Sequence, residues 1–188
     1  MPGPEGILAL LDSRSFGSIW FWAILTLAWT LAGRRILGVP ADVLGAVGRA
    51  PSGSGDDPAA LALLDWLSLT LPRWRLGARE GAILLGVGAF LLTALAILGF
   101  GYGLEMAQAL VLLILPFAGL FLLELQLAKR LGAILTRAET GQPVNQAGAE
   151  AARLMRRHRH GVLAVSVFSV ALTAFYGAAW MIAHPFGF

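Results

Sequence analysis

The chain has 188 residues, of which 57% are hydrophobic and 13% are charged, and its mean hydropathy is +0.74. Soluble domains are about 45–50% apolar and about 25% charged, so this composition excludes an ordinary soluble fold, and its high hydrophobicity excludes intrinsic disorder. Because the chain has no cysteine, it has no disulfide framework, no thiolate metal site and no cysteine nucleophile. The composition predicts a small all-α membrane protein with several spans.

Four apolar stretches have about the length that a bilayer crossing requires. We predict four transmembrane helices, over residues 16–33, 81–100, 104–123 and 161–183, within a single membrane domain that comprises 1–188. The first stretch is predicted to be a retained anchor and not a signal peptide, because no basic region precedes it and no small-residue cleavage site follows it.

The distribution of basic residues predicts the orientation of the spans. Every Lys and Arg except Arg14 lies in the two segments 34–80 and 124–160. Such residues are retained on the cytoplasmic side, so we expect both termini outside and both basic segments inside a bacterial inner membrane. This topology accounts for the isoelectric point of about 10.2 without a nucleic-acid partner.

The first cytoplasmic segment is predicted to contain two helices. A short helix over 41–50 follows Pro40, and residues 50–55 form a flexible link. Asp57 is predicted to be the N-cap of the helix over 59–71, because Pro58 follows it at the first helical position. That helix is too short to span, and we expect it to lie on the inner leaflet, with packing in a core, docking to a partner or a re-entrant segment as alternatives.

The second cytoplasmic segment is predicted to be a helical hairpin over residues 125–160. The apolar stripe of the third span continues at helical spacing beyond the membrane, and a second stripe leads into the fourth span. Thr140–Pro143 lies between them and contains Gly and Pro, which is typical of a helix end. We therefore expect a basic, antiparallel extension of helices 3 and 4 in the cytoplasm.

Small residues within the spans predict helix packing. Ser169, Thr173 and Gly177 recur every four residues in the fourth span, and Gly86 lies in the second. Pro116 lies midway along the third span, where it predicts a kink or a packing contact, with a gating hinge as the alternative.

Two polar residues lie at the start of the third span. Glu105 and Gln108 are predicted to be an interface anchor and a helix–helix hydrogen bond, with a functional polar site of a transporter as the alternative. No nucleotide-binding or hydrolase motif is present, so we expect no enzyme, no catalytic residue and no cofactor.

A basic cluster precedes the fourth span. Arg156, Arg157 and Arg159 are predicted to set the topology, with binding of anionic lipid or of an acidic partner as alternatives. His158 and His160 alternate with them, but residues two apart point in different directions on a helix, and the arginines repel cations. We therefore expect no metal site.

Three blocks carry a resemblance to a known family. They are the run from Leu11 to Phe16 leading into Trp20–Trp22, the run Leu37–Pro40 followed by Asp42, and the run from Leu98 to Glu105 leading into Ala107–Ala109. With the span pattern, they resemble a family of small alphaproteobacterial inner-membrane proteins, some of which are labelled "component of the SufBCD complex". The resemblance implies the same fold and location. The label implies docking to iron–sulfur assembly machinery, because a chain without cysteine has no thiolate for a cluster.

The sequence leaves two functions from different classes. The first is a non-catalytic accessory, assembly or scaffold subunit that packs against a larger membrane complex or against further copies of itself. The alternative is a small oligomeric transporter or channel.

Overall fold

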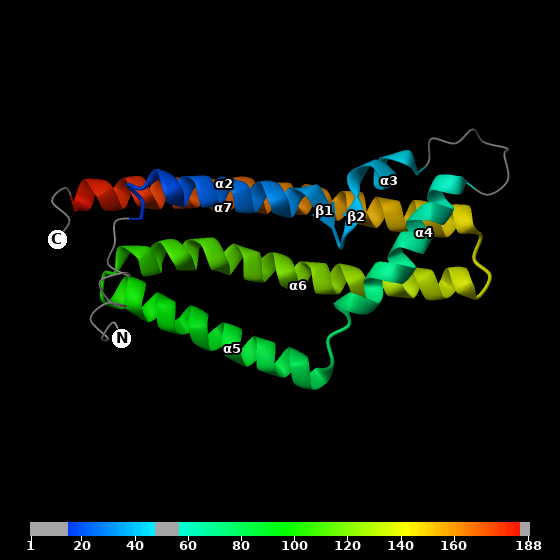
Figure 1. Cartoon of the computed structure of the whole chain (residues 1–188), viewed down its shortest axis with the longest axis horizontal. Coiled ribbons are helices and arrows are strands. Elements are labelled where there is room, and N and C mark those ends of the chain that lie inside the picture. Colours follow the sequence, from blue (N-terminus) through cyan, green and yellow to red (C-terminus); the bar gives the residue numbers. More distant parts are fainter. Residues whose placement is uncertain (1–14, 48–56, 185–188) are drawn as a thin grey trace. The chain divides into compact units, whose positions relative to one another are not determined.

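The computed structural model describes residues 15–47 and 57–184, and 86% of these residues are helical. Figure 1 shows the elements in chain order. Three helices are long and apolar enough to cross a membrane: Ala78–Gly101, Glu105–Glu139 and Val144–Ala183. The stretch expected to form the first span is the shorter apolar helix α2, Ile19–Arg34. The link expected at 50–55, and the end of the helix expected over 41–50, lie outside the described residues.

The chain divides into two compact units. Among the described residues, unit 1 contains 15–29, 77–119 and 165–184, and unit 2 contains 30–47, 57–76 and 120–164. Helices α2, α6 (Glu105–Glu139) and α7 (Val144–Ala183) contribute to both. The two units are described in turn.

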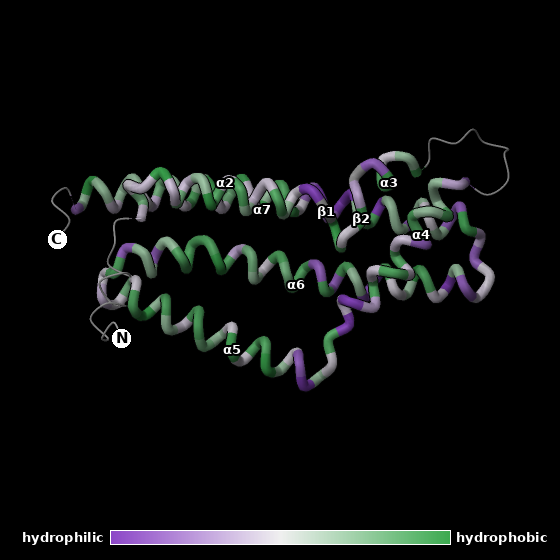
Figure 2. Tube along the Cα trace, viewed as in Figure 1, coloured by the Kyte–Doolittle hydropathy of each residue, from purple (hydrophilic) through white to green (hydrophobic). Residues whose placement is uncertain are grey.

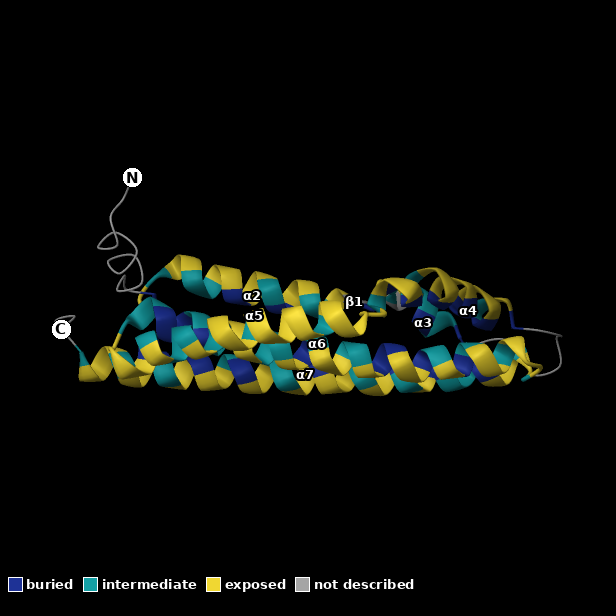
Figure 3. Ribbon diagram, turned by 90° about the horizontal axis from the view of Figure 1, so that it is seen from below, coloured by how far each residue is buried: buried dark blue, intermediate teal, exposed yellow. Residues whose placement is uncertain are grey.

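Unit 1 exposes apolar helix faces. Helix α5, Ala78–Ala96, has no buried residue, and its side chains Leu85 and Phe90 are exposed, as are Phe168 and Phe175 on α7. Figure 2 shows that α5 is hydrophobic beyond its polar first turn, and Figure 3 colours most of it as exposed. Large apolar patches of this kind are rare on soluble monomers, whereas lipid-facing helices require them. The pattern indicates a membrane protein.

A short turn joins α5 to α6. Helix α5 continues as a π-helical segment, η2, over Ile97–Gly101, and the backbone N–H of Leu104 donates to the carbonyl of Leu98. Gly103 has a φ of +76°, in the left-handed region that favours glycine. This conformation lets α5 and α6 join through a short turn.

Unit 2 is built on the hairpin of α6 and α7. Helix α6 ends at Glu139 and α7 begins at Val144, which confirms the predicted helix stop, and Gly141 has a φ of +114°. Near the turn, Arg137 of α6 and Glu150 of α7 form an exposed ion pair with an N–O distance of 2.8 Å. The facing apolar side chains of the two helices lie in one core: Leu127, Leu131, Ile134, Ala147, Ala151 and Met155.

Helix α4, Pro58–Thr70, packs on this hairpin and is followed by the short helix η1, Leu71–Trp74. Asp57 is its N-cap, as predicted, and accepts a hydrogen bond from the N–H of Ala59. Leu63 and Leu67 are fully buried in the core, whereas Leu69 is exposed. Helix α4 therefore meets the hairpin with one face and leaves an apolar face uncovered.

A small β-hairpin that the sequence did not suggest follows α2. Strand β1, Arg35–Ile36, pairs antiparallel with β2, Val39–Pro40, and the short helix α3, Ala41–Ala46, follows. Leu37 and Gly38 between the strands have φ values of 52° and 82°, as a two-residue type I′ turn requires. A left-handed leucine is strained, but Leu37 is 1% exposed in the unit 2 core, and this burial compensates.

Candidate functional site

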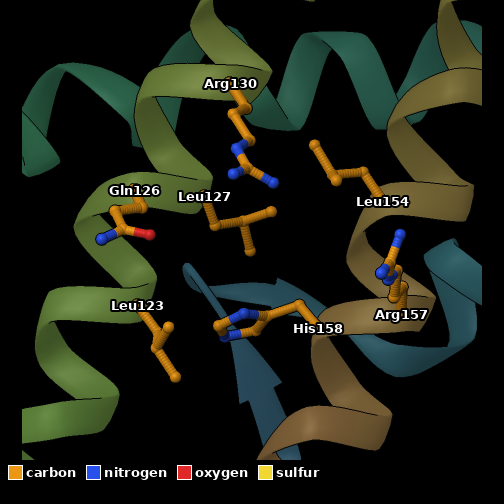
Figure 4. A pocket seen from close by; sticks show the side chains of 7 residues that line it. All are labelled: Leu123, Gln126, Leu127, Arg130, Leu154, Arg157 and His158. Carbon is orange, nitrogen blue, oxygen red and sulfur yellow. The ribbon is translucent and has the colours of Figure 1, made fainter.

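A pocket lies between the two arms of the hairpin in unit 2. It has a volume of about 160 Å³. The residues that line it come from α6 and α7: Leu123, Gln126, Leu127, Arg130, Leu154, Arg157 and His158. Figure 4 shows Arg130 and Leu127 on one helix and Leu154 and Arg157 on the other, with the His158 ring extending from the second helix toward the first. The pocket thus combines three leucines with two guanidinium groups, an amide and an imidazole.

The charge of this pocket is uncompensated. None of its lining residues is acidic, and among the residues that the structure describes neither Arg130 nor Arg157 has an ion pair or a hydrogen bond. Guanidinium groups bind phosphate and carboxylate in a bidentate manner. The arrangement is therefore suited to an anion.

His158 supplies a further polar atom. Its Nε2 atom is buried without a hydrogen-bond partner, although part of the residue is exposed. Burial lowers the pKa of His158 below its ordinary value, so the imidazole is neutral at pH 7. A neutral imidazole with Nε2 protonated donates one hydrogen bond there, and this atom has no acceptor within the described chain.

The three arginines of the sequence cluster separate in space. Arg157 lines the pocket, whereas Arg156 lies on another face and donates to the carbonyl of Leu44 at 3.4 Å. Arg159 is exposed and does not line the pocket. Among the described residues, no group of three or more His, Asp or Glu side chains could hold a metal ion.

Glu105 lies in unit 1, where it holds the chain before α2. Its Oε1 accepts from the backbone N–H of Phe16 at 2.6 Å, and the Trp22 indole N–H donates to the Phe16 carbonyl at 2.9 Å. The Phe16 ring is 1% exposed, and it lies so close to Gly177 that a Cβ there would be 2.9 Å from a ring carbon. Glu105 thus fixes the entry to α2.

Glu105→Ala is expected to release Phe16, because it removes the acceptor of a charge-assisted hydrogen bond, which contributes about 1.5–3 kcal/mol. We expect a cysteine introduced by Ser15→Cys to react at least tenfold faster with a maleimide in the Glu105→Ala background. The chain has no native cysteine to interfere. Glu105→Gln is the matched control, because its amide oxygen can still accept. Equal labelling rates in the Glu105→Ala chain and in the chain that keeps Glu105 would contradict this role.

Gln108 lies one turn further along α6 and closes the turn from α5. Its Nε2 donates to the carbonyl of Gly99 at 2.8 Å, and the side chain is 1% exposed. Its Oε1 is buried without a partner in the described part of the chain. The amide therefore holds the π-helical end of α5 against α6.

The expected packing residues lie in different surroundings. On α7, Thr173 is 1% exposed and its hydroxyl donates to the Ser169 carbonyl, and Gly177 contacts Phe16. Pro116 lies inside α6, and the next residue, Phe117, packs against Trp29 with ring centroids 4.6 Å apart. Gly86, by contrast, is exposed on α5, and a Cβ added there would contact nothing within 4 Å.

Sequence reasoning missed that Arg130 and Arg157 line one pocket. A partial signal was present, because the two arms of a helical hairpin lie side by side, which places this stretch of α6 near the basic cluster of α7. The Phe16–Glu105 contact had no such signal, since 89 positions separate the two residues.

Comparison of the chain with protein-family models, curated proteins and solved structures found no match.

Proposed function

We propose that this chain is a non-catalytic accessory or scaffold subunit of a larger membrane complex, in the inner membrane of a bacterium. In this proposal α2 is a fourth span, both termini lie outside, and the exposed apolar face of α4 rests on the inner leaflet. The resemblance noted above adds iron–sulfur assembly machinery as a candidate partner of the basic hairpin.

The observation that carries the proposal is the uncovered small-residue face of α5. Ala82, Gly86, Ala89 and Thr93 follow one another at helical spacing and are all exposed. Lipid tails are as apolar as leucine, so spans associate where small side chains permit close approach. On α7 the small-residue stripe of Ser169, Thr173 and Gly177 is already covered, and Gly177 lies against Phe16. We therefore expect a partner span or a second copy of the chain to pack against this face of α5.

The polar residues support this proposal over a transporter or channel. A transport site needs polar groups that are available at mid-depth in the membrane. Glu105 accepts from the Phe16 backbone and Gln108 donates to Gly99, so both act on the chain itself. Loss of solute flux in proteoliposomes on Glu105→Ala, with the fold retained, would support the transporter instead.

Co-purification tests the accessory role. In mild detergent, we expect a membrane-protein partner or a homo-oligomer to be recovered with the chain, and Gly86→Leu to lower that recovery about tenfold. Val87→Leu is the matched control, because Val87 is also exposed on α5 but on another face. Recovery as a monomer at every expression level, or equal recovery for both variants, would contradict the proposal.

Cysteine labelling tests the orientation. Gln146 is exposed beside the hairpin turn, and Tyr102 is exposed in the turn between α5 and α6. In intact cells, we expect an impermeant maleimide to label Tyr102→Cys and to label Gln146→Cys only after permeabilisation. The reverse result would invert the topology.

A further inference from the structure

The apolar parts of α6 and α7 locate the pocket that Arg130 and Arg157 line relative to the membrane. Arg130 lies about 10 Å along α6 from Leu123, where the third predicted span ends, and Arg157 lies about 6 Å before Gly161, where the fourth begins, at 1.5 Å per residue. The headgroup layer on each side of a bilayer is roughly 5–7 Å thick. Long arginine side chains extend toward this layer while their stems remain on apolar surface. Arg157 therefore lies within the headgroup layer, and the long side chain of Arg130, which starts a few ångströms beyond that layer, can reach it.

The lining of the pocket combines polar groups with an apolar exit. On α6 it runs from Leu123, nearest the predicted span, through Gln126 and Leu127 to Arg130, whereas on the antiparallel α7 Arg157 and His158 lie nearer the predicted span than Leu154. A soluble anion needs only the guanidinium and imidazole groups of such a site. A molecule with a phosphate next to an apolar chain also contacts Leu123.

The charge of the lining selects among lipids. Two guanidinium groups without an acidic neighbour repel the cation of a zwitterionic headgroup, whereas they attract a headgroup with net negative charge. The amide of Gln126 adds a neutral donor to the two arginines, and His158 adds a second one in the tautomer that carries its proton on Nε2.

We infer that this pocket is a binding site for one anionic phospholipid, whose phosphate lies between Arg130 and Arg157 and whose acyl chain leaves along Leu123. The inference rests on membrane insertion of α6 and α7 and is independent of the accessory role. The lipid connects the two arms of the hairpin at the membrane surface, where their like charges otherwise repel each other.

Lipid binding to the purified full-length chain tests the inference. With native mass spectrometry in detergent, we expect one phosphatidylglycerol to bind at least tenfold more tightly than phosphatidylcholine. The double variant Arg130→Gln/Arg157→Gln is expected to weaken phosphatidylglycerol binding at least tenfold. Arg130→Lys/Arg157→Lys keeps the charge but loses bidentate geometry, so we expect an intermediate loss.

A charge-matched control keeps the test specific. Lys129 and Arg159 are exposed neighbours of the two arginines but do not line the pocket. Lys129→Gln/Arg159→Gln removes the same net charge and is expected to change binding by less than twofold. Equal loss in both Gln variants, with circular dichroism unchanged, would show diffuse attraction and would overturn the site.

A competition experiment separates a lipid from a soluble anion. We expect inorganic phosphate and glycerol phosphate, each at a hundredfold excess, to leave the bound phosphatidylglycerol in place, because neither contacts the leucines. Displacement by either one would assign the pocket to a soluble phosphate and overturn the inference of a lipid site.

Discussion

Gly148→Ala is expected to detach α4 from the hairpin of α6 and α7. A Cβ at this position would lie 2.5 Å from the Cβ and 2.9 Å from the Cα of Ala60, so the backbone of α4 itself must move. Overpacking of this kind costs about 1–3 kcal/mol, and here it also exposes the fully buried Leu63 and Leu67. We expect amide hydrogen exchange in α4 to accelerate at least tenfold, while the part of α6 before Gly119 keeps its protection.

The matched control is Gly132→Ala on α6, where an added Cβ contacts nothing within 4 Å. Replacing a helical glycine by alanine stabilises a helix by about 0.5–1 kcal/mol, so this variant should be as stable as the parent or slightly more so. Adding Ala60→Gly to Gly148→Ala removes the shortest contact and should restore part of the protection. Unchanged exchange in Gly148→Ala would mean that α4 does not pack as closely as described.

Gly99→Ala is expected to open the turn between α5 and α6. A Cβ there would lie 2.7 Å from the backbone nitrogen of Gln108 and 3.1 Å from the carbonyl carbon of Ala107, and neither atom can rotate away. The movement would also break the hydrogen bond from Gln108 to the Gly99 carbonyl. Overpacking and a lost buried hydrogen bond together are expected to lower the free energy of unfolding by about 3 kcal/mol.

Unfolding by SDS in mixed micelles measures this effect. Gly101→Ala is the control, because its Cβ would make only an ordinary contact at 3.8 Å with Ile97. Gln108→Leu removes the hydrogen bond without the clash, so its loss should be smaller, at about 0.5–2 kcal/mol. Equal stability of the two glycine variants would contradict the close approach of α5 and α6.

Local patterns predicted the helices well. The Asp57–Pro58 start of α4 and the helix stop at Thr140–Pro143 lie where capping chemistry places them, because these signals involve neighbouring residues only. The β-hairpin at Arg35–Pro40 was missed because its turn uses a leucine with positive φ. No local preference favours that residue there; the burial of Leu37 in the core does.

The candidate site was predictable only in part. The basic cluster before the fourth span was visible in the sequence, but its division was not: Arg157 faces a pocket with Arg130, whereas Arg156 reaches Leu44. Similarly, Glu105 was recognised as a polar residue at a span end, yet its partner Phe16 belongs to a distant part of the chain. Both outcomes depend on which helix faces meet.

By itself, the sequence determined that the chain is helical and apolar enough for a membrane, and where its long helices begin and end. Hydropathy and capping act over one or two helical turns, so a linear reading captures them. Only the tertiary structure decided that α4 covers the hairpin at Gly148, that Phe16 lies on Gly177, and that Arg130 and Arg157 line one pocket without an acidic residue in its lining. These contacts depend on close packing between elements that are distant in the chain. Such complementarity of shape produces no repeating pattern that can be recognised in the sequence.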